Sequence, residues 1–361
     1  MLRHTVMQFP ELSTSLNEIL QKGTVIPAHP LVLDEHRRLD VARQRRLTRY
    51  YMASGAGGIA VGVHTTQFEI RSPEVELYEM VLNLAAREVE ESATARSMIK
   101  VAGIVGSPRQ AVKEAEVAVR LGYDLGLLSM GGLDSYTETQ LIDRAYSVAA
   151  VIPLFGFYLQ PAVGGRVLSY NFWREFADIP NVYAIKVAAF NRYQTIDVVR
   201  AVCASQRRDK IALYTGNDDN IIADLLTPYR FQVDGTGVEK RFVGGLLGHW
   251  AVWTSVAVQL LKEVRQCVEN GDKDVAALLK KNVHVTDMNA AIFDVANAFH
   301  GCIPGIHEVL RRQGLLEGTW CLDPDEKLSP GQAQEIDRIC RHYPDLTDDA
   351  FVRKFLADDR S

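Results

Sequence analysis

Short apolar runs alternate with amphipathic stretches along most of the chain, from residue 24 to about residue 270. Such runs are typical of buried strands, and amphipathic stretches between them are typical of repeated βα units around a parallel sheet. Eight runs fit this description: "TVIPAHPL" (24–31), "GGIAVGV" (57–63), "IKVAGIV" (99–105), "YDLGLLSM" (123–130), "IPLFGFYL" (152–159), "VYAIKVAA" (182–189), "IALYTG" (211–216) and "FQVDGTGV" (231–238).

Eight βα units predict a closed (β/α)₈ TIM barrel, an α/β fold. The stretch "PRQAVKEAEVAVRLG" between the third and fourth runs repeats Ala111, Ala115 and Ala118 at helical spacing, and Gly122 marks its end. The structural rival is a doubly wound open sheet. Its first βα turn would carry a GxGxxG motif, which this sequence lacks at that place.

Beyond about residue 272 the pattern becomes purely helical. We therefore divide the chain into an N-terminal segment (1–23), the barrel (24–270), a C-terminal helical segment packed on the barrel (271–342) and a charged tail (343–361). The tail, "YPDLTDDAFVRKFLADDRS", is rich in charged residues, and we expect it to be loosely held.

Composition narrows the class of protein. The 361 residues are 47% hydrophobic and 24% charged, with a formal net charge of −5, which is ordinary for a globular protein and gives no electrostatic reason to expect nucleic acid. The five cysteines form no CxxC pair, which indicates reduced thiols and a cytoplasmic protein. We expect no membrane segment, because no signal peptide and no run of about 18 apolar residues is present.

One charged residue, Lys186, interrupts the sixth apolar run. Strand alternation places it on the same face as Ala184 and Ala188, while the isoleucine and valine between them take the other face. The bulky face should meet the helices. Lys186 then points into the barrel between two alanines that leave space for a small molecule. Burying an ammonium costs several kcal/mol, so the position requires a reason.

The same alternation applies to two other runs. In the fifth run it suggests that Phe155 and Phe157 face outward and that Gly156 and Tyr158 face inward, and in the second it turns His64 inward. These polar groups fall near the C-terminal ends of the strands, where barrel enzymes carry their active sites.

Carbonyl chemistry supplies a reason for a buried lysine. Only the neutral amine attacks a carbonyl, and a lysine with the ordinary pKa of about 10.4 is almost entirely protonated near neutral pH. Burial lowers the pKa of a lysine, and a tyrosine hydroxyl such as that of Tyr158 can move the protons that imine chemistry requires. The adjacent Thr65 and Thr66 offer hydroxyl and N–H groups to a carboxylate.

Several segments carry a family resemblance. In order, "SGAGGIAVGVHTT", "AVKEAEVAVRLGYDLGLL", "FGFYLQP", "AIKVAAFN" and "YTGNDD" resemble motifs of the dihydrodipicolinate synthase and N-acetylneuraminate lyase family of class I aldolases, and "VLRRQGLLEG" resembles its C-terminal helix. The resemblance extends from about residue 20 to about residue 340.

The resemblance implies a (β/α)₈ barrel whose lysine forms an imine with pyruvate or a related 2-oxo acid, with or without an aldehyde as second substrate. The enzyme would be an aldolase, which cleaves or forms a carbon–carbon bond, or a dehydratase acting on a sugar acid. It implies no external cofactor and a homo-oligomer. On this basis Lys186 is the imine-forming lysine, Tyr158 the proton relay, and Thr65 and Thr66 the pair that holds the carboxylate of the 2-oxo acid.

The chain also departs from the family pattern. Where the family has Gly-Thr-Thr-Gly-Glu, this sequence reads "HTTQF", and where the synthases carry an arginine for the second substrate, "YLQPAVGGR" has Val163. We therefore expect a lyase other than a true dihydrodipicolinate synthase, with a neutral, apolar or hydroxylated partner. The candidate substrate-binding residues are Thr65, Thr66, His64, Gln67, Phe68, Gly235 and Arg166.

Two other functions stay open. Asp218 and Asp219 in "GNDD" have the look of a metal loop, as in a metal-assisted barrel aldolase or hydrolase, although such aspartates more often cap the next helix, and we expect no bound metal. The altered "HTTQF" also leaves open a non-catalytic protein that binds a keto acid without turnover. The role of His64 in this motif also stays open, because it is either a substrate contact or a packed core histidine.

Overall fold

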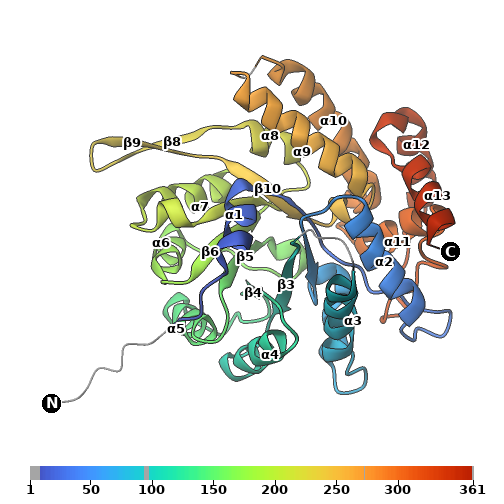
Figure 1. Ribbon diagram of the computed structural model, residues 1–361, viewed down its shortest axis with the longest axis horizontal. Coiled ribbons are helices and arrows are strands. Elements are labelled where there is room, and N and C mark those ends of the chain that lie inside the picture. Colours follow the sequence, from blue (N-terminus) through green and yellow to red (C-terminus); the bar gives the residue numbers. More distant parts are fainter. Residues whose placement is uncertain (1–8, 93–96, 272, 360–361) are drawn as a thin grey trace.

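The computed structural model describes residues 9–92, 97–271 and 273–359. Eight parallel strands form one sheet in the order β1-β10-β7-β6-β5-β4-β3-β2, curled into a barrel (Figure 1). The His29 N–H donates to the Ala60 carbonyl at 2.8 Å and joins the first strand to the second. The strands are β1 (Val25–Pro27), β2 (Gly58–Val61), β3 (Ile99–Ile104), β4 (Leu125–Ser129), β5 (Leu154–Leu159), β6 (Val182–Ala188), β7 (Ala212–Thr215) and β10 (Phe242–Leu247).

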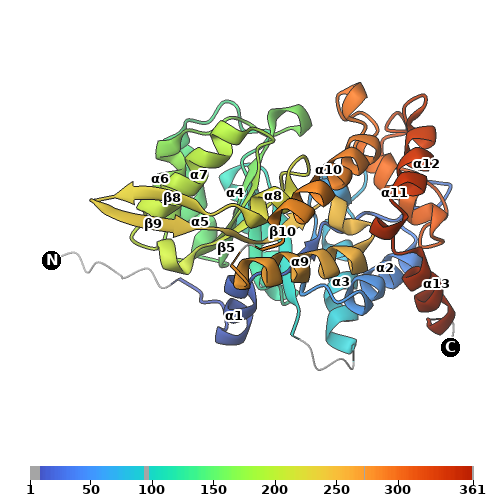
Figure 2. The ribbon, with the colours of Figure 1, turned by 90° about the horizontal axis from the view of Figure 1, so that it is seen from above.

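A helix follows each barrel strand and covers the outside of the sheet, so the predicted (β/α)₈ TIM barrel is confirmed (Figures 1 and 2). N-capping side chains mark the start of several of these helices. The Ser107 hydroxyl, for example, accepts a hydrogen bond from the Gln110 N–H at the start of α4. The helices are α2 (Val41–Ala53), α3 (Tyr78–Glu91), α4 (Pro108–Arg120), α5 (Glu138–Ala149), α6 (Tyr170–Asp178), α7 (Arg192–Ala204), α8 (Ile221–Leu226) and α9 (Thr254–Glu269).

The interior of the barrel forms its own apolar cluster, separate from the layer between strands and helices. Phe155, Phe157, Ala184 and Ala188 belong to this interior cluster. At the N-terminal end of the barrel, α1 (Thr14–Lys22) adds Leu20 to the same cluster. The N-terminal end is thereby filled with side chains, which leaves the C-terminal end for a binding site.

The predicted eighth strand was wrong. The run 231–238 is divided by Asp234 and Gly235 into an antiparallel hairpin of β8 (Tyr229–Val233) and β9 (Thr236–Lys240), which projects from the barrel (Figure 2). Asp234 and Gly235 both have positive φ, 49° and 78°, as an Asp-Gly hairpin turn requires. The barrel position belongs to β10, the apolar "FVGGLL" that follows the hairpin and pairs with β1 and β7.

The C-terminal segment packs as predicted in a helical layer, and the tail is not loosely held. The helices are α10 (Val275–Ile292), α11 (Cys302–Arg312), α12 (Gln332–His342) and α13 (Asp349–Asp358). Asp348 accepts a hydrogen bond from the Tyr50 hydroxyl at 2.7 Å, and Asp359 pairs with Arg46 and Arg49 of α2. Asp348 and Asp359 of the tail are thus partners of the barrel and hold the tail against it.

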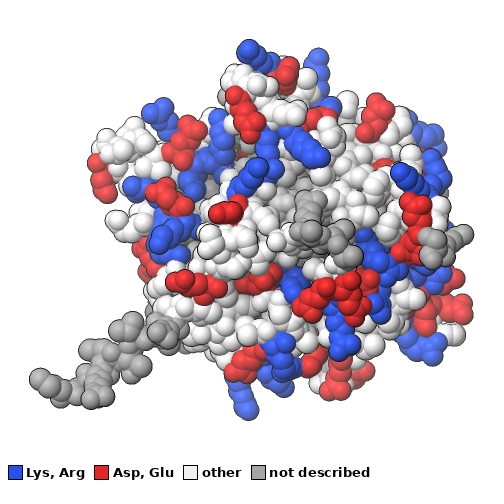
Figure 3. All heavy atoms as spheres, in the orientation of Figure 1, with Lys and Arg blue, Asp and Glu red and all other residues white. Residues whose placement is uncertain are grey.

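The surface carries mixed charge on the face seen in Figure 3, where Lys and Arg side chains lie among Asp and Glu. All five cysteines are free thiols. Within residues 9–92, 97–271 and 273–359, no helix combines the length and apolar character that a membrane crossing needs.

Candidate active site

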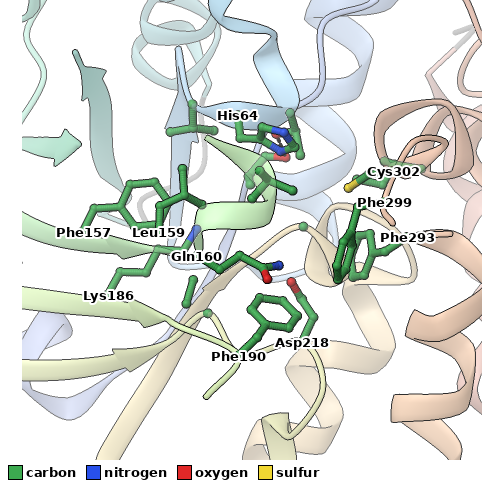
Figure 4. A pocket seen from close by; sticks show the side chains of 18 residues that line it. His64, Phe157, Leu159, Gln160, Lys186, Phe190, Asp218, Phe293, Phe299 and Cys302 are labelled. Atoms are coloured by element: carbon green, nitrogen blue, oxygen red, sulfur yellow. Dashed lines mark hydrogen bonds between the residues drawn. The ribbon is translucent and has the colours of Figure 1, made fainter. Parts of the chain in front are cut away.

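A cavity of about 560 Å³, including its mouth, lies at the C-terminal end of the barrel. Strand ends and the loops that follow them form one wall, with Phe157, Lys186 and Asp218 among the lining side chains (Figure 4). The C-terminal segment forms the opposite wall with Phe293 and Cys302. The cavity thus lies at the end where barrel enzymes place their chemistry.

Lys186 projects from β6 into this cavity, as predicted. It is 8% exposed, and its Nζ lies 4.3 Å from the centre of the Phe157 ring on β5. Gly216, after β7, gives it room, because a Cβ there would lie 2.6 Å from the Lys186 Cε. The lysine is therefore held against an aromatic face in a slot that the glycine keeps open.

The amine of Lys186 forms neither a hydrogen bond nor an ion pair with another residue in the described part of the chain. Burial lowers the pKa of Lys186, and the nearby Asp218 carboxylate opposes this shift. Lys100, near the start of β3, offers a contrast. It is equally buried, but its Nζ pairs with Glu90 at 2.8 Å. Lys100 has the partner expected of a structural lysine, and Lys186 does not.

The orientation predicted for β5 was reversed. Phe155 and Phe157 face the barrel interior, whereas Tyr158 lies in the outer layer, where its ring stacks on Trp173 of α6 at 5.3 Å. The Tyr158 hydroxyl accepts a hydrogen bond from the Leu168 N–H at 3.3 Å. Tyr158 is thus absent from the cavity lining, and the inward position beside Lys186 is held by Phe157.

The two threonines differ in their roles. Thr65 lines the cavity and donates its hydroxyl to the Ala28 carbonyl at 2.8 Å. Thr66 lies behind it, where its hydroxyl donates to the His29 carbonyl at 2.7 Å and accepts the N–H groups of residues 62 and 63. Thr66 therefore shapes the turn that presents Thr65.

His64 lines the cavity as well. Burial, followed by the charge of Lys186, lowers the pKa of His64 to about 4. The imidazole is consequently neutral at physiological pH.

Gln67 and Phe68 stand behind His64 rather than in the lining. The Gln67 Oε1 accepts a hydrogen bond from the Leu322 N–H at 2.6 Å, which ties this turn to the C-terminal segment. The ring of Phe68 lies 6.0 Å from that of His64. Both residues support the turn that carries His64.

Arg166 and Gly235 also lie outside the lining. The guanidinium of Arg166 donates to the carbonyls of Leu133 and Tyr136 at 2.7 and 3.1 Å, so it joins two loops. Gly235 is in the turn of the β8–β9 hairpin, because the run in which it was predicted is not a barrel strand.

Sequence reasoning missed the aromatic side of the cavity. Phe190, Phe293, Phe299 and Ile306 line it together with Cys302 (Figure 4). Phe190 follows β6 and its ring meets that of Phe299 at 6.0 Å. The other four residues come from the segment after the barrel, and the apolar character of a residue does not show which neighbour it faces.

Asp218 was considered only as a metal ligand or helix cap, yet it lines the cavity on the loop after β7. Its Oδ1 accepts the His249 N–H at 3.4 Å, and its carbonyl accepts the Asn289 amide at 2.6 Å. Burial raises the pKa of Asp218, and the charge of Lys186 opposes the shift. A carboxylate directly after the strand that neighbours the lysine strand was the signal available in the sequence.

The alternative of a metal-assisted enzyme would require a cluster of metal ligands. Among the residues that the structure describes, no group of three or more His, Cys, Asp or Glu side chains is arranged to hold a metal ion. Asp219, the second aspartate of the motif, is exposed and does not line the cavity.

Comparisons with known proteins agree with this architecture. The N-acetylneuraminate lyase of Citrobacter koseri is 27% identical over 209 residues, which are 56% of this chain and 65% of that protein, so the match spans less than two thirds of the relative. The dihydrodipicolinate synthase of Oceanobacillus iheyensis superposes with a TM-score of 0.70 at 17% identity, over 91% of this chain and 98% of that one.

A second solved structure, the N-acetylneuraminate lyase of Fusobacterium nucleatum, gives a TM-score of 0.68 at 17% identity, over 89% of this chain and 99% of that one. At such identities the likeness shows a shared fold. The profile of the dihydrodipicolinate synthetase family matches residues 21–343. From a match over nearly the whole sequence we conclude that this chain belongs to the dihydrodipicolinate synthetase family.

Proposed function

We propose that this protein is a class I lyase in which Lys186 forms an imine with pyruvate or a related 2-oxo acid, without an external cofactor. The family consists of lyases of the Schiff-base aldolase type. The observation that carries the proposal for this chain is the amine of Lys186, buried in a cavity and without an acidic partner in contact. The lowered pKa of Lys186 favours the neutral amine, which is the form that attacks a carbonyl.

The carboxylate of the 2-oxo acid has a suitable position near Thr65. This residue lines the cavity at the start of a short helical turn, and its side chain shares the lining with neutral His64. N–H groups at a helical turn stabilise a carboxylate by charge-assisted hydrogen bonds, while the Thr65 hydroxyl is donated to the Ala28 carbonyl. We assign the carboxylate to this corner and the carbonyl carbon to the Nζ of Lys186.

The rest of the cavity favours an apolar partner group. Phe190, Phe293, Phe299 and Ile306 present aromatic and aliphatic surface opposite Lys186. Arg166 is occupied with backbone carbonyls outside the lining. An anionic partner would be desolvated there without a cationic contact, which is costly. We therefore propose a neutral, apolar or hydroxylated partner and an activity other than true dihydrodipicolinate synthesis.

Reductive trapping tests the imine. The full chain is incubated with pyruvate or a longer 2-oxo acid and borohydride, and intact mass with peptide mapping locates the adduct. We expect one reduced ligand on Lys186. Lys186→Arg should abolish the label, whereas Lys100→Arg, which keeps the pair with Glu90, should retain it. A label that persists at another residue in Lys186→Arg would refute the assignment.

A second candidate function is a barrel that binds a keto acid without turnover. The outward position of Tyr158 favours it, since the expected relay hydroxyl does not reach the cavity. The two functions differ in the exchange of the methyl protons of pyruvate in D₂O, observed by NMR. A lyase forms the enamine and exchanges these protons, whereas a simple binder leaves them in place.

A further inference from the structure

Imine chemistry needs a group that gives and takes protons beside the lysine, and Tyr158 does not supply it here. We propose that Asp218 is the acid–base residue of this active site and that it exchanges protons with the intermediates formed on Lys186. The inference rests on the proposed lyase function and names the residue that makes turnover, rather than mere binding, feasible.

The fold places the Lys186 amine and the Asp218 carboxylate at the same cavity. Lys186 on β6 is the register partner of Tyr214 on the adjacent β7, and Asp218 lies on the loop that continues from that strand. Figure 4 shows the Lys186 nitrogen and the Asp218 carboxylate directed into the same cavity, with the Gln160 amide between them in this view. A substrate bound to Lys186 would therefore face Asp218.

The loop that carries Asp218 is firmly held. The Asn217 side chain accepts the Phe190 N–H at 3.0 Å and donates to Asp224 at 2.9 Å. The Asn289 amide holds the Asp218 carbonyl at 2.6 Å. In the part of the chain that the structure describes, the Asp218 carboxylate has one hydrogen bond, from the His249 N–H at 3.4 Å, and no salt bridge. It is thus positioned by its backbone while its oxygens stay available to a ligand.

The other polar groups in the cavity are less suited to the task. The Thr65 hydroxyl is already donated to the Ala28 carbonyl. Burial lowers the pKa of His64 to about 4 and raises the pKa of the Cys302 thiol, so the first is a weak base and the second stays protonated. Gln160 carries an amide, which does not ionise.

The electrostatics of the pair fit the role. Burial raises the pKa of Asp218 and lowers that of Lys186, while each group opposes the shift of the other. Other titratable groups near Asp218 are Asp219 beside it, which raises its pKa, His249, whose imidazole pKa burial lowers to about 4, and Cys302 across the cavity. An acid poised near neutral pH both donates and accepts protons efficiently.

In the first step, the Lys186 nitrogen forms a bond to the carbonyl carbon, and a proton passes from nitrogen to oxygen to give a carbinolamine. The carboxylic acid of Asp218 then protonates the hydroxyl oxygen. The C–O bond breaks with its electron pair on the departing water, and the nitrogen lone pair forms the C=N bond. The products are a protonated imine, water and the Asp218 carboxylate.

In the second step, that carboxylate removes a proton from C3 of the bound pyruvate, and the C–H electron pair forms the enamine as the C=N pair returns to nitrogen. For cleavage of a 4-hydroxy-2-oxo acid it removes the hydroxyl proton instead. The O–H pair then forms the C=O bond of the aldehyde, which departs as the C3–C4 pair becomes the enamine double bond and the C=N pair returns to nitrogen. In either case Asp218 ends as the neutral acid, ready to return its proton.

The matched pair Asp218→Asn and Asp219→Asn tests the inference. The two residues are neighbours, but only Asp218 lines the cavity. We expect Asp218→Asn to retain borohydride trapping of pyruvate on Lys186 after long incubation. Exchange of the methyl protons of pyruvate in D₂O should fall by about 10²-fold or more, the scale of a lost general acid or base. Asp219→Asn should match the parent in both assays.

A second readout separates an electrostatic role from a structural one. The Asp218 charge raises the pKa of Lys186, so its removal should lower that pKa further. Acrylonitrile, a small neutral electrophile, adds only to the neutral amine. The pH midpoint of its addition to Lys186, followed by peptide mass, should move to lower pH in Asp218→Asn and stay in place in Asp219→Asn.

Three outcomes would overturn the inference: exchange within about threefold of the parent in Asp218→Asn, equal losses in the two variants, or an unchanged midpoint for acrylonitrile. Thermal denaturation of both variants shows whether the fold is retained. Failure of the proposed function is a separate result, because it appears in the parent as the absence of any pyruvate adduct on Lys186.

Discussion

The Nζ of Lys186 lies 4.3 Å from the centre of the Phe157 ring, and the two residues are register partners on β6 and β5. The face of an aromatic ring attracts an ammonium, which favours the charged form. The same ring also excludes water, which favours the neutral form. Burial is the dominant influence, because the pKa of Lys186 is lowered overall. Phe157 is therefore part of the burial around the amine, and it carries no hydroxyl.

The outward position of Tyr158 leads to a prediction about its hydroxyl. Tyr158→Phe removes one acceptor for the Leu168 N–H, 10 residues along the chain, and should lower the free energy of unfolding by about 1 kcal/mol. Pyruvate proton exchange should stay within about threefold of the parent, because the hydroxyl does not face Lys186. NMR exchange rates and urea denaturation measure the two effects. A loss of exchange of about 10²-fold would contradict the orientation.

Gly216 should control access of Lys186 to its substrate. In Gly216→Ala the new Cβ would lie 2.6 Å from the Lys186 Cε and 2.8 Å from the Ala188 Cβ, so the lysine must shift. We expect trapping of pyruvate to slow by about tenfold, since a displacement of about 1 Å costs reactivity, and stability to fall by about 1–3 kcal/mol from overpacking.

Gly235→Ala is the control for that experiment. No atom lies within 4 Å of a Cβ there, but φ is +78°, so the substitution should cost about 1–2 kcal/mol of stability through backbone strain. Trapping should be unchanged, because the hairpin turn lies outside the cavity lining. If Gly216→Ala and Gly235→Ala slowed trapping of pyruvate equally, the space around Lys186 would not be what limits the reaction.

The apolar wall predicts the choice of second substrate. With pyruvate as donor, aspartate semialdehyde should be used at least about tenfold less efficiently than neutral apolar aldehydes, because charge-assisted contacts worth about 1.5–3 kcal/mol are missing. Phe299→Ala should lower kcat/KM for aromatic aldehydes by about tenfold through lost apolar contact.

Arg166→Ala provides the control for partner choice, since its guanidinium donates to the Leu133 and Tyr136 carbonyls. The ratio of efficiencies for the charged and neutral aldehydes should stay the same in this variant. If aspartate semialdehyde matched the best neutral aldehyde and Arg166→Ala removed that activity, the arginine would have to move into the site.

The ordered tail predicts an effect on stability without an effect on chemistry. Asp348 accepts hydrogen bonds from Tyr50, Ser255 and Gln313, so Asp348→Ala leaves the buried Tyr50 hydroxyl and two half-buried donors without this acceptor and should cost about 1–3 kcal/mol in urea denaturation. Asp345→Ala, exposed in the same segment, should change stability by at most about 0.5 kcal/mol. Trapping on Lys186 should persist in both, and its loss in Asp348→Ala would place the tail in the active site.

The sequence by itself determined the βα alternation, the closed barrel and the inward direction of Lys186. The repeat of apolar runs requires strands that are buried on both faces, and eight of them close a sheet. On β6 the small alanines and the lone charge identify the inner face. The position of Thr65 and His64 at the C-terminal end of the barrel was predicted in the same way, because both residues come just beyond the end of a strand.

Tertiary structure alone decided which face of β5 is the inner one. Gly156 and Tyr158 alternate with two phenylalanines, and both faces of the strand are buried, so hydrophobicity does not distinguish them. Which face of β5 turns inward depends on the helix that packs against the strand. Phe176 of α6 fills the space over Gly156, and Trp173 of α6 stacks on the ring of Tyr158. The eighth strand was decided similarly, because "FVGGLL" and the hairpin before it compete for one place beside β1 and β7.

Tertiary structure also decided the composition of the cavity. Phe293, Phe299 and Cys302 line the same cavity as Lys186 although more than 100 positions of sequence separate them, and their apolar character indicates burial but not the neighbour. Asp218 had an ordinary local explanation as a helix cap. Its relation to Lys186 arises from the pairing of β6 with β7, because parallel neighbouring strands bring their C-terminal ends to the same edge of the barrel.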